Sequence, residues 1–154
     1  MEEPHLVLKV LQELPITKSD LGPWPRSWRE STCVMGVINI TPDSFSDGGE
    51  CISIDNALAR AYKHISEGVD VLDLGAQSTR PGAKQVGSKE EIRRLLPVLR
   101  EIRRTFPKII ISVDTYLADV ADSAISEGAN WINDISGGRL DPKILNVLAN
   151  SNCP

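Results

Sequence analysis

From Cys33 onward, short apolar runs alternate with segments in which apolar residues recur at every third or fourth position. The runs are rich in Val and Ile, as expected for strands buried on both faces of a parallel sheet. They cover residues 33–39, 69–74, 109–113 and 130–135. The segments between them have the period of an amphipathic helix. This alternation predicts four βα units and an α/β fold with a parallel sheet.

Local signals indicate where the first two predicted helices begin and end. The first helix covers residues 54–65 and is stopped by Gly68. The second opens with Ser88 and Glu91, which have the spacing of a capping box. Because proline removes a backbone donor, Pro97 inside this second segment predicts a kink or a helix restart.

The third and fourth predicted helices also carry end signals. The third covers residues 117–125 and stops at Gly128. The fourth begins at Asp141 and Pro142, a capping residue followed by proline at the first helical position.

A faint internal repeat supports a fold built from βα units. The tripeptide Ser-Glu-Gly leads into a strand at residues 66–68 and again at residues 126–128. In that register Asp73 falls on Asn133, so two strands carry a polar residue near their carboxyl ends. The interval equals two units of about 30 residues each, the size of a βα repeat.

Residues 1–32 lack this alternation. An amphipathic stretch ends at Pro15, and an irregular connector with Trp24 and Trp28 follows it. We interpret residues 1–32 as a linker or N-terminal extension and residues 33–154 as the α/β domain.

Composition limits the class of protein. The chain has 154 residues, of which 41% are hydrophobic and 25% charged, as in ordinary globular domains. A net charge of −4 argues against nucleic acid or an acidic membrane as partner. Three cysteines without CxxC spacing favour a reducing compartment. With no apolar run of about 20 residues and no basic secretory leader, a cytoplasmic location is expected, or a mitochondrial one if a longer precursor exists.

Polar residues lie at the carboxyl ends of all four predicted strands. These ends share one edge of a parallel sheet, where α/β enzymes place their sites. Asp114 and Asn133 together suit the edge of a heterocycle, because a carboxylate accepts hydrogen bonds and an amide both donates and accepts them. The alternative for Asp114 is the N-cap of the helix near Leu117. Asp73 lies inside its strand, and we expect it to serve structure by bonding neighbouring loops.

The residues of the loop after the second predicted strand predict an anion-binding site. Arg80 offers a planar fork of donors suited to phosphate oxygens. Ser78 and Thr79 add hydroxyl groups, and Gly82 allows close approach of the backbone. The alternative is an ordinary loop with an exposed arginine.

Two segments carry a resemblance to a known family. Residues 34–49 read Val-Met-Gly-Val-Ile-Asn-Ile-Thr-Pro-Asp-Ser-Phe-Ser-Asp-Gly-Gly, and residues 78–82 read Ser-Thr-Arg-Pro-Gly. Both resemble signatures of dihydropteroate synthase, an enzyme of folate biosynthesis, and the resemblance extends over residues 30–150. It implies a TIM-type (β/α)₈ barrel, of which this chain would contain the first four βα units. The implied reaction condenses 6-hydroxymethyl-7,8-dihydropterin diphosphate with p-aminobenzoate and yields 7,8-dihydropteroate and diphosphate.

The resemblance implies a role for each matching residue around the diphosphate. Asn39 would bind Mg²⁺ near the diphosphate. Thr79 and Arg80, with the Ser78 hydroxyl beside them, would hold the diphosphate itself. Arg80 would thereby also assist its departure.

Around the two rings the resemblance implies four further roles. Asp114 and Asn133 would bind the pterin. Phe45 would form a wall of the p-aminobenzoate pocket, and Asp47 would face the cation that develops at the pterin methylene. Closure of the loops would exclude water.

The chain also departs from the family pattern. Gly-Ala-Gln at residues 75–77 stands where bacterial members commonly carry Gly-Gly-Glu. The connector Trp-Pro-Arg at residues 24–26 is similar to fungal enzymes, in which the synthase follows other folate-pathway domains. Four further strands and their binding residues have no counterpart. A half-barrel exposes strand edges, so we expect instability, self-association or pairing with a missing half, and little or no activity of the chain alone.

Two other functions stay open on the sequence. A pterin-dependent methyltransferase shares the barrel, the aspartate and the asparagine, but not the two signature loops. A non-catalytic, truncated pterin-binding fragment is the second alternative.

Overall fold

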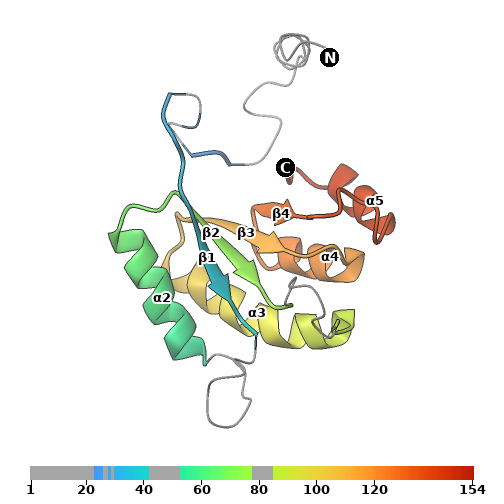
Figure 1. Ribbon diagram of the computed structural model, residues 1–154, viewed down its shortest axis with the longest axis horizontal. Helices are drawn as coiled ribbons and strands as arrows, with labels where there is room; N and C mark the ends of the chain where they lie inside the picture. The colour runs from blue at the N-terminus through green and yellow to red at the C-terminus, as the bar shows by residue number, and fades with distance from the viewer. Residues whose placement is uncertain (1–22, 26–27, 29, 42–52, 78–84) are drawn as a thin grey trace, which may run out of the picture.

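The computed structural model describes residues 23–25, 28, 30–41, 53–77 and 85–154. Strands and helices alternate along the described chain, as Figure 1 shows. The elements are β1 (Met35–Asn39), α2 (Ile54–Ser66), β2 (Val71–Gly75), α3 (Ser88–Thr105), β3 (Ile110–Asp114), α4 (Ala118–Ser126), β4 (Trp131–Asn133) and α5 (Lys143–Ala149). All four predicted strands are confirmed, with ends that differ from the prediction by at most two residues.

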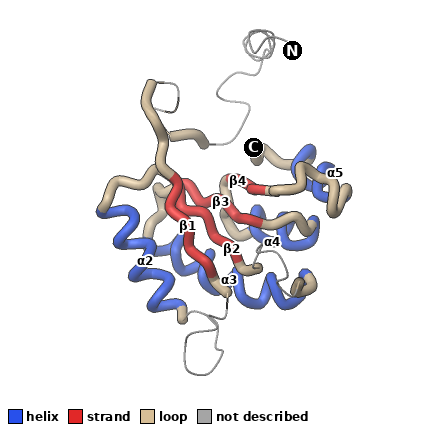
Figure 2. The backbone as a smooth tube through the Cα atoms, viewed as in Figure 1, coloured by secondary structure: helices blue, strands red, loops and turns tan. Residues whose placement is uncertain are grey.

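The sheet is parallel throughout, and its strands follow one another in chain order, β1-β2-β3-β4. Each helix contacts the next one along the chain, and the helices lie along the outside of the curved sheet (Figure 2). A doubly wound sheet would instead reverse its strand order and carry helices on both faces. The arrangement is that of the first four units of a (β/α)₈ barrel, which confirms the predicted fold class.

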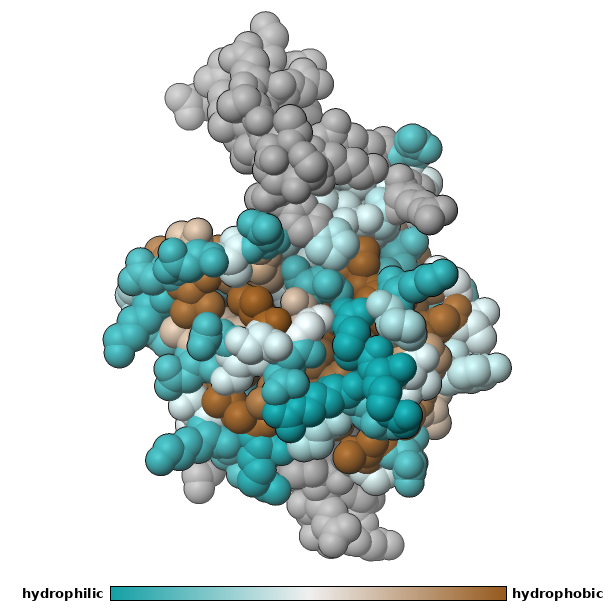
Figure 3. Space-filling model, turned by 180° about the vertical axis from the view of Figure 1, so that it is seen from behind, coloured by the Kyte–Doolittle hydropathy of each residue, from teal (hydrophilic) through white to brown (hydrophobic). Residues whose placement is uncertain are grey.

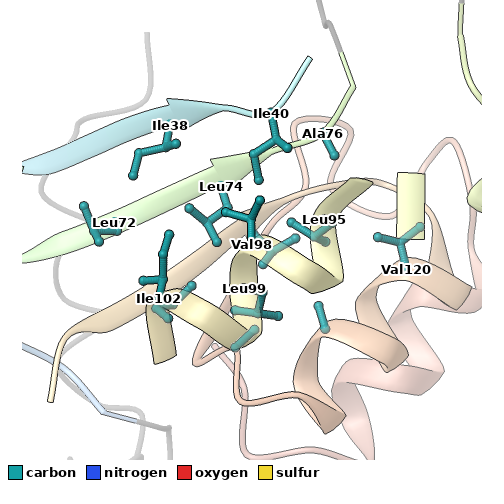
Figure 4. Close-up of a cluster of buried hydrophobic side chains, with 14 of the residues drawn as sticks. Ile38, Ile40, Leu72, Leu74, Ala76, Leu95, Val98, Leu99, Ile102 and Val120 are labelled. Atoms are coloured by element: carbon teal, nitrogen blue, oxygen red, sulfur yellow. The ribbon is translucent and has the colours of Figure 1, made fainter. Parts of the chain in front are cut away.

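One hydrophobic core lies between the sheet and the helices. Figure 4 shows side chains of β1 and β2 pointing toward those of α3. Ile38, Leu74 and Val113 are fully buried on the strand side, and Leu95 and Leu99 meet them from α3. Seen from behind, the molecule carries hydrophilic side chains between smaller hydrophobic patches (Figure 3). The core therefore fixes the helices against one face of the sheet only.

The start and the middle of α3 differ from the sequence-based expectation. The helix runs through Pro97 without a restart, because the proline is exposed while residues on the opposite side of the helix pack in the core. The predicted capping box is also wrong. Gly87 is the N-cap and makes no side-chain cap bond, while Ser88 Oγ bonds Asp119 Oδ2 at 3.4 Å. Glu91 is buried instead of reaching back to the helix start.

The start of α5 lies close to its predicted position. Asp141 lies one residue before the N-cap and not at it as predicted, although its Oδ1 still accepts from Lys143 N at 3.2 Å. Its Oδ2 accepts from Ala118 N at 2.9 Å, which joins the beginnings of α5 and α4. Pro142 occupies the N-cap position, one residue before the helix begins.

The aromatic connector before β1 packs against β4. Trp24 lies between Trp28 and Trp131, with ring centroids 4.8 Å and 4.9 Å apart. Trp131 Nε1 donates to Pro23 O at 2.8 Å. These contacts hold the connector at the amino end of β4, away from the edge with the polar strand ends. Among the described helices, none is long and apolar enough to cross a membrane.

Candidate functional site at the carboxyl ends of the strands

The strand register sorts the residues of the inner face, which points away from the helices, into layers. A lower layer is formed by residues that pair across all four strands: Val37, Asp73, Ser112 and Trp131. An upper layer at the carboxyl ends is formed in the same way: Asn39, Gly75, Asp114 and Asn133. The register thus brings three predicted site residues into one row.

Gly75 separates two of these side chains. A Cβ atom at this position would lie 3.7 Å from Asn39 Oδ1 and 3.7 Å from Asp114 Oδ2. The missing side chain therefore leaves a small cradle, with an amide oxygen on one side and a carboxylate oxygen on the other.

Asn133 is held from below by Asp73. Its Nδ2 donates to Asp73 Oδ2 at 3.2 Å, so the two residues related by the internal repeat contact each other. Asp73 thus bonds a residue of β4, two strands away in the sheet. Most of the loops that follow β1 and β2 lies outside the described residues, so the expected bonds to neighbouring loops stay a prediction. Asp73 Oδ1 and Ser112 Oγ are buried and have no hydrogen-bond partner within the described part of the chain.

Asp114 is the half-buried acid of this row. Burial raises its pKa to about 6, and the negative charges of Asp73 and Asp134 act in the same direction. Asp114 does not cap α4, because Leu117 is the N-cap and its backbone N–H is bonded by Thr115 Oγ1. The structural alternative for Asp114 is thus wrong, and its carboxylate accepts no hydrogen bond from the residues that the structure describes.

The loop after β4 is organised by Asp134. Its Oδ1 accepts from Ser136 N and its Oδ2 from Gly138 N, both at 2.7 Å. Although burial opposes the shift, these hydrogen bonds hold the pKa of Asp134 below its usual value. Gly138 has a φ of 79°, a conformation in which a side chain would be strained, and a Cβ there would meet Leu145 at 2.8 Å. Asp134 therefore shapes the loop beside the row.

Other buried polar residues support the strand ends, and the sequence analysis gave them no such role. Gln77 Nε2 donates to Tyr116 Oη at 3.1 Å, and Gln77 Oε1 accepts from Val86 N at 3.2 Å. Gln77 thereby joins the segments that follow β2 and β3. Thr115 N donates to Asn133 O at 3.2 Å and joins β3 to β4. The only feature of the sequence that could have indicated these contacts was the position of each polar residue next to the end of a strand.

The remaining predicted site residues cannot be placed in this row. Phe45, Asp47, Ser78, Thr79 and Arg80 lie outside the described residues. The structure consequently brings together Asn39, Asp114 and Asn133, and the roles of the loops stay predictions.

The donor atoms of the row fit Mg²⁺ better than a soft metal. Mg²⁺ prefers oxygen ligands and is commonly held by one or two protein oxygens together with substrate phosphates. Asn39 Oδ1, beside the Gly75 cradle, is such an oxygen. Across the residues that the structure describes, no group of three His, Cys, Asp or Glu side chains could hold a metal ion.

Comparison with known sequences gives relatives from plants and bacteria. Over 126 residues the chain is 53% identical to the mitochondrial folate synthesis bifunctional protein of Arabidopsis thaliana, covering 80% of this chain and 23% of that protein. Over 128 residues it is 49% identical to dihydropteroate synthase of Bacillus subtilis, covering 83% of this chain and 45% of that enzyme. The chain therefore spans less than half of each relative.

Comparison with solved structures gives the same kind of relative as the comparison with known sequences. A crystal structure of dihydropteroate synthase from Clostridium difficile in the presence of pteroic acid superimposes with a TM-score of 0.72 at 44% identity. The match covers 77% of this chain and 45% of that one. The sequence model of the pterin binding enzymes matches residues 35–154, from the start of β1 to the last residue. The chain therefore belongs to the pterin binding enzyme family.

Proposed function

We propose that the chain forms the pterin-binding half of a dihydropteroate synthase barrel. The single observation that carries the proposal is the row of Asn39, Gly75, Asp114 and Asn133 at the carboxyl ends of the strands. Relatives that share this part of the barrel are named dihydropteroate synthase, which favours this reaction over methyl transfer. The substrates are the pterin diphosphate and p-aminobenzoate, and the products are 7,8-dihydropteroate and diphosphate.

Asp114 and Asn133 bind the pterin ring in this proposal. The ionised Asp114 carboxylate accepts hydrogen bonds from ring N–H and amino groups. Asn133 lies beside it and is oriented by its bond to Asp73, so its amide presents the same atoms to each ligand. The cradle at Gly75 supports this assignment, because it leaves room next to the Asp114 oxygen.

In this proposal the diphosphate is bound by Asn39, through Mg²⁺, and by the segment after β2. Asn39 would hold Mg²⁺, which when bound supplies positive charge against the departing diphosphate. Ser78, Thr79 and Arg80 donate hydrogen bonds to the diphosphate oxygens. Stabilising this anion favours cleavage of the bond between the pterin methylene carbon and the diphosphate oxygen, whose electron pair leaves with the diphosphate.

In this proposal the segment after β1 binds the second substrate, p-aminobenzoate. Phe45 packs against the p-aminobenzoate ring, and the Asp47 carboxylate faces the cation at the pterin methylene. The amine nitrogen of p-aminobenzoate then forms the new bond to that carbon and releases one of its two protons to solvent. Exclusion of water from this cation prevents its hydrolysis.

The chain alone should show little or no turnover, because it spans less than half of its synthase relatives. We propose that it works with the second half of a barrel or associates with a second copy of itself. The proposed compartment is the cytoplasm, or the mitochondrion as for the plant relative.

A calorimetric titration tests the proposal. The purified chain is titrated with a non-hydrolysable pterin diphosphate analogue and Mg²⁺, and the titration is repeated with Asp114→Ala. Micromolar binding that the substitution abolishes is the expected result. A folded chain that does not bind the analogue, or binds it equally well with either residue, would contradict the assignment.

A further inference from the structure

Gln77, just beyond the end of β2, holds its side-chain amide in one orientation. Its Oε1 accepts a hydrogen bond from Val86 N at 3.2 Å. Because a backbone N–H can only donate, the amide atom that faces Val86 must be the oxygen. The amide nitrogen, Nε2, therefore faces the other way and lies 3.1 Å from Tyr116 Oη. Gln77 is buried, so both bonds are largely shielded from solvent.

This orientation sets the direction of the hydrogen bond to Tyr116. An amide nitrogen donates, so the Tyr116 oxygen is the acceptor. The bond to Gln77 therefore does not use the proton of the Tyr116 hydroxyl group. Among the described residues, none accepts this proton. Tyr116 is half-buried, and a donor in such a position favours a ligand that brings an acceptor.

Tyr116 lies beyond the row on the same face of the sheet as Asp114. Thr115 N donates to Asn133 O at 3.2 Å, which extends the ladder between β3 and β4 past Asp114. Side chains alternate along an extended segment, so Asp114 and Tyr116 share one side and the buried Thr115 side chain takes the other. Two residues of extended chain span about 6.5 Å. The Tyr116 side chain therefore follows Asp114 in the direction in which the strands end.

The diphosphate is the part of the ligand that suits a donor at this position. In the proposed function the pterin ring lies at the row, where its N–H and amino groups donate to Asp114. Gln77 directly precedes the segment that the proposed function assigns to the diphosphate. Diphosphate oxygens are charged and only accept hydrogen bonds, and a bond from a hydroxyl group to a charged oxygen is a strong one. The Tyr116 proton therefore fits a diphosphate oxygen better than the donor groups of the ring.

We propose that Tyr116 is a further ligand-binding residue, whose hydroxyl group donates to a diphosphate oxygen, and that Gln77 is the positioning residue that keeps it a donor. The inference rests on the proposed function, because it concerns the same ligand. Glutamate at position 77 would accept from Val86 N and from the Tyr116 hydroxyl group alike, since a carboxylate has no proton to donate. It would thereby take the Tyr116 proton away from the ligand.

The test compares two ligands and three variants of the full chain. The ligands are the pterin diphosphate analogue with Mg²⁺ and 6-hydroxymethyl-7,8-dihydropterin, which lacks the diphosphate. Tyr116→Phe keeps the ring and removes the hydroxyl group. Gln77→Glu keeps an acceptor for Val86 N and reverses the bond to Tyr116, and the third variant combines both changes. Each is titrated by calorimetry at about pH 8, where a glutamate is ionised, and urea unfolding verifies that each is folded.

We expect Tyr116→Phe to weaken binding of the analogue about 10- to 100-fold, the loss of one hydrogen bond to a charged oxygen. Binding of the pterin without diphosphate should change by less than about twofold, whereas a purely structural role would weaken both ligands. Gln77→Glu should weaken binding of the analogue by about tenfold or more, because the carboxylate accepts the Tyr116 proton and adds a negative charge. In that background Tyr116→Phe should cost less than about threefold, since the proton is already taken.

The two ligands distinguish a failure of this inference from a failure of the proposed function. If the unchanged chain binds neither ligand, the proposed function fails and the inference with it. If it binds both, three results would overturn the role of Tyr116 while the proposed function stands. These are unaltered binding of the analogue by Tyr116→Phe, equal weakening of both ligands, and a full effect of Tyr116→Phe in the Gln77→Glu background.

Amide hydrogen exchange tests the orientation of Gln77 without ligand. The Val86 amide should be protected in the unchanged chain and in Gln77→Glu, because both side chains offer it an oxygen. It should be less protected in Gln77→Leu, which has no acceptor. Equal protection in Gln77→Leu would overturn the orientation on which the direction of the bond to Tyr116 depends.

Discussion

The two faces of the same strands differ sharply in chemistry. On the face toward the helices, Leu74 and Val113 have no exposed surface and pack in a continuous apolar core. On the opposite face their immediate neighbours in the chain are Asp73 and Ser112, which are also buried but polar. Both polar side chains contain an atom without a partner in the described part of the structure.

The two faces of the sheet therefore serve different purposes: the helix-facing side stabilises the fold, and the inner side carries the candidate site. Burying apolar surface stabilises the fold, whereas burying an unpaired polar atom destabilises it. The apolar core on the helix-facing side thus stabilises the fold. Part of this stabilisation offsets the cost of burying the polar residues of the inner side. Polar groups on the inner side orient the row at the strand ends, as the bond from Asn133 to Asp73 illustrates.

The largest expected effect comes from the helix-facing side. Leu74→Ala should lower the free energy of unfolding by about 2–5 kcal/mol, because it leaves a cavity in the core. Val37→Ala is the matched control on the inner side. Since Val37 is 53% exposed, its truncation should change the free energy by less than about 0.5 kcal/mol. Urea unfolding measures both, and equal losses would remove the distinction between the faces.

The next effect concerns binding at the row. Asp114→Asn should weaken binding of the pterin analogue about 10- to 100-fold, since it replaces a charged acceptor with a neutral amide. The free energy of unfolding should not fall, because a half-buried charge is removed. Calorimetry and urea unfolding of one preparation measure both quantities. A variant that loses stability but binds normally would reverse the roles assigned to the two faces.

A smaller effect is expected at the amino end of β4. Trp24→Ala should cost about 0.5–1.5 kcal/mol for each of its two aromatic contacts, beyond the apolar area that the ring buries. Binding of the analogue should not change, because the Trp24 ring contacts Trp28 and Trp131 rather than the row. Tryptophan fluorescence during urea unfolding monitors the stack, and a loss of ligand affinity would contradict this separation.

The smallest effect is the pH dependence that Asp114 contributes. Its pKa is raised to about 6, so the folded chain binds this proton more tightly than the unfolded chain does. The contribution to stability is therefore present below about pH 4 and lost as the pH rises through about 6. The difference in unfolding free energy between the chain and Asp114→Asn should change over this interval. A difference that is flat from pH 4 to 7 would contradict the raised pKa.

The sequence predicted the helix-facing side better than the inner side. Apolar runs and helical periods report burial directly, so the four strands and their parallel order followed from them. Spacing does not report the direction in which a side chain points. Ser88 and Glu91 have capping-box spacing, yet the glutamate turns into the interior. Pro97 likewise predicted a kink or a helix restart, whereas α3 continues through it with the proline exposed, which the sequence alone does not show.

Only those residues of the candidate site that lie at the carboxyl end of a strand could be predicted from the sequence. Asn39, Asp114 and Asn133 were placed in one row because the carboxyl ends of parallel strands share an edge. The support from Gln77 and Thr115 depends on contacts between loops distant in sequence, which no local pattern encodes.

The most direct test of the account is a ¹³C NMR titration of the Asp114 carboxyl group with and without the pterin analogue. In the free chain the pKa should be about 6, raised by burial and by the neighbouring acids. If the ionised carboxylate binds the pterin, saturation with the analogue should move this pKa well below 6, because the ligand stabilises the charged form. An identical titration curve with and without bound analogue would contradict the assignment of Asp114 to the pterin.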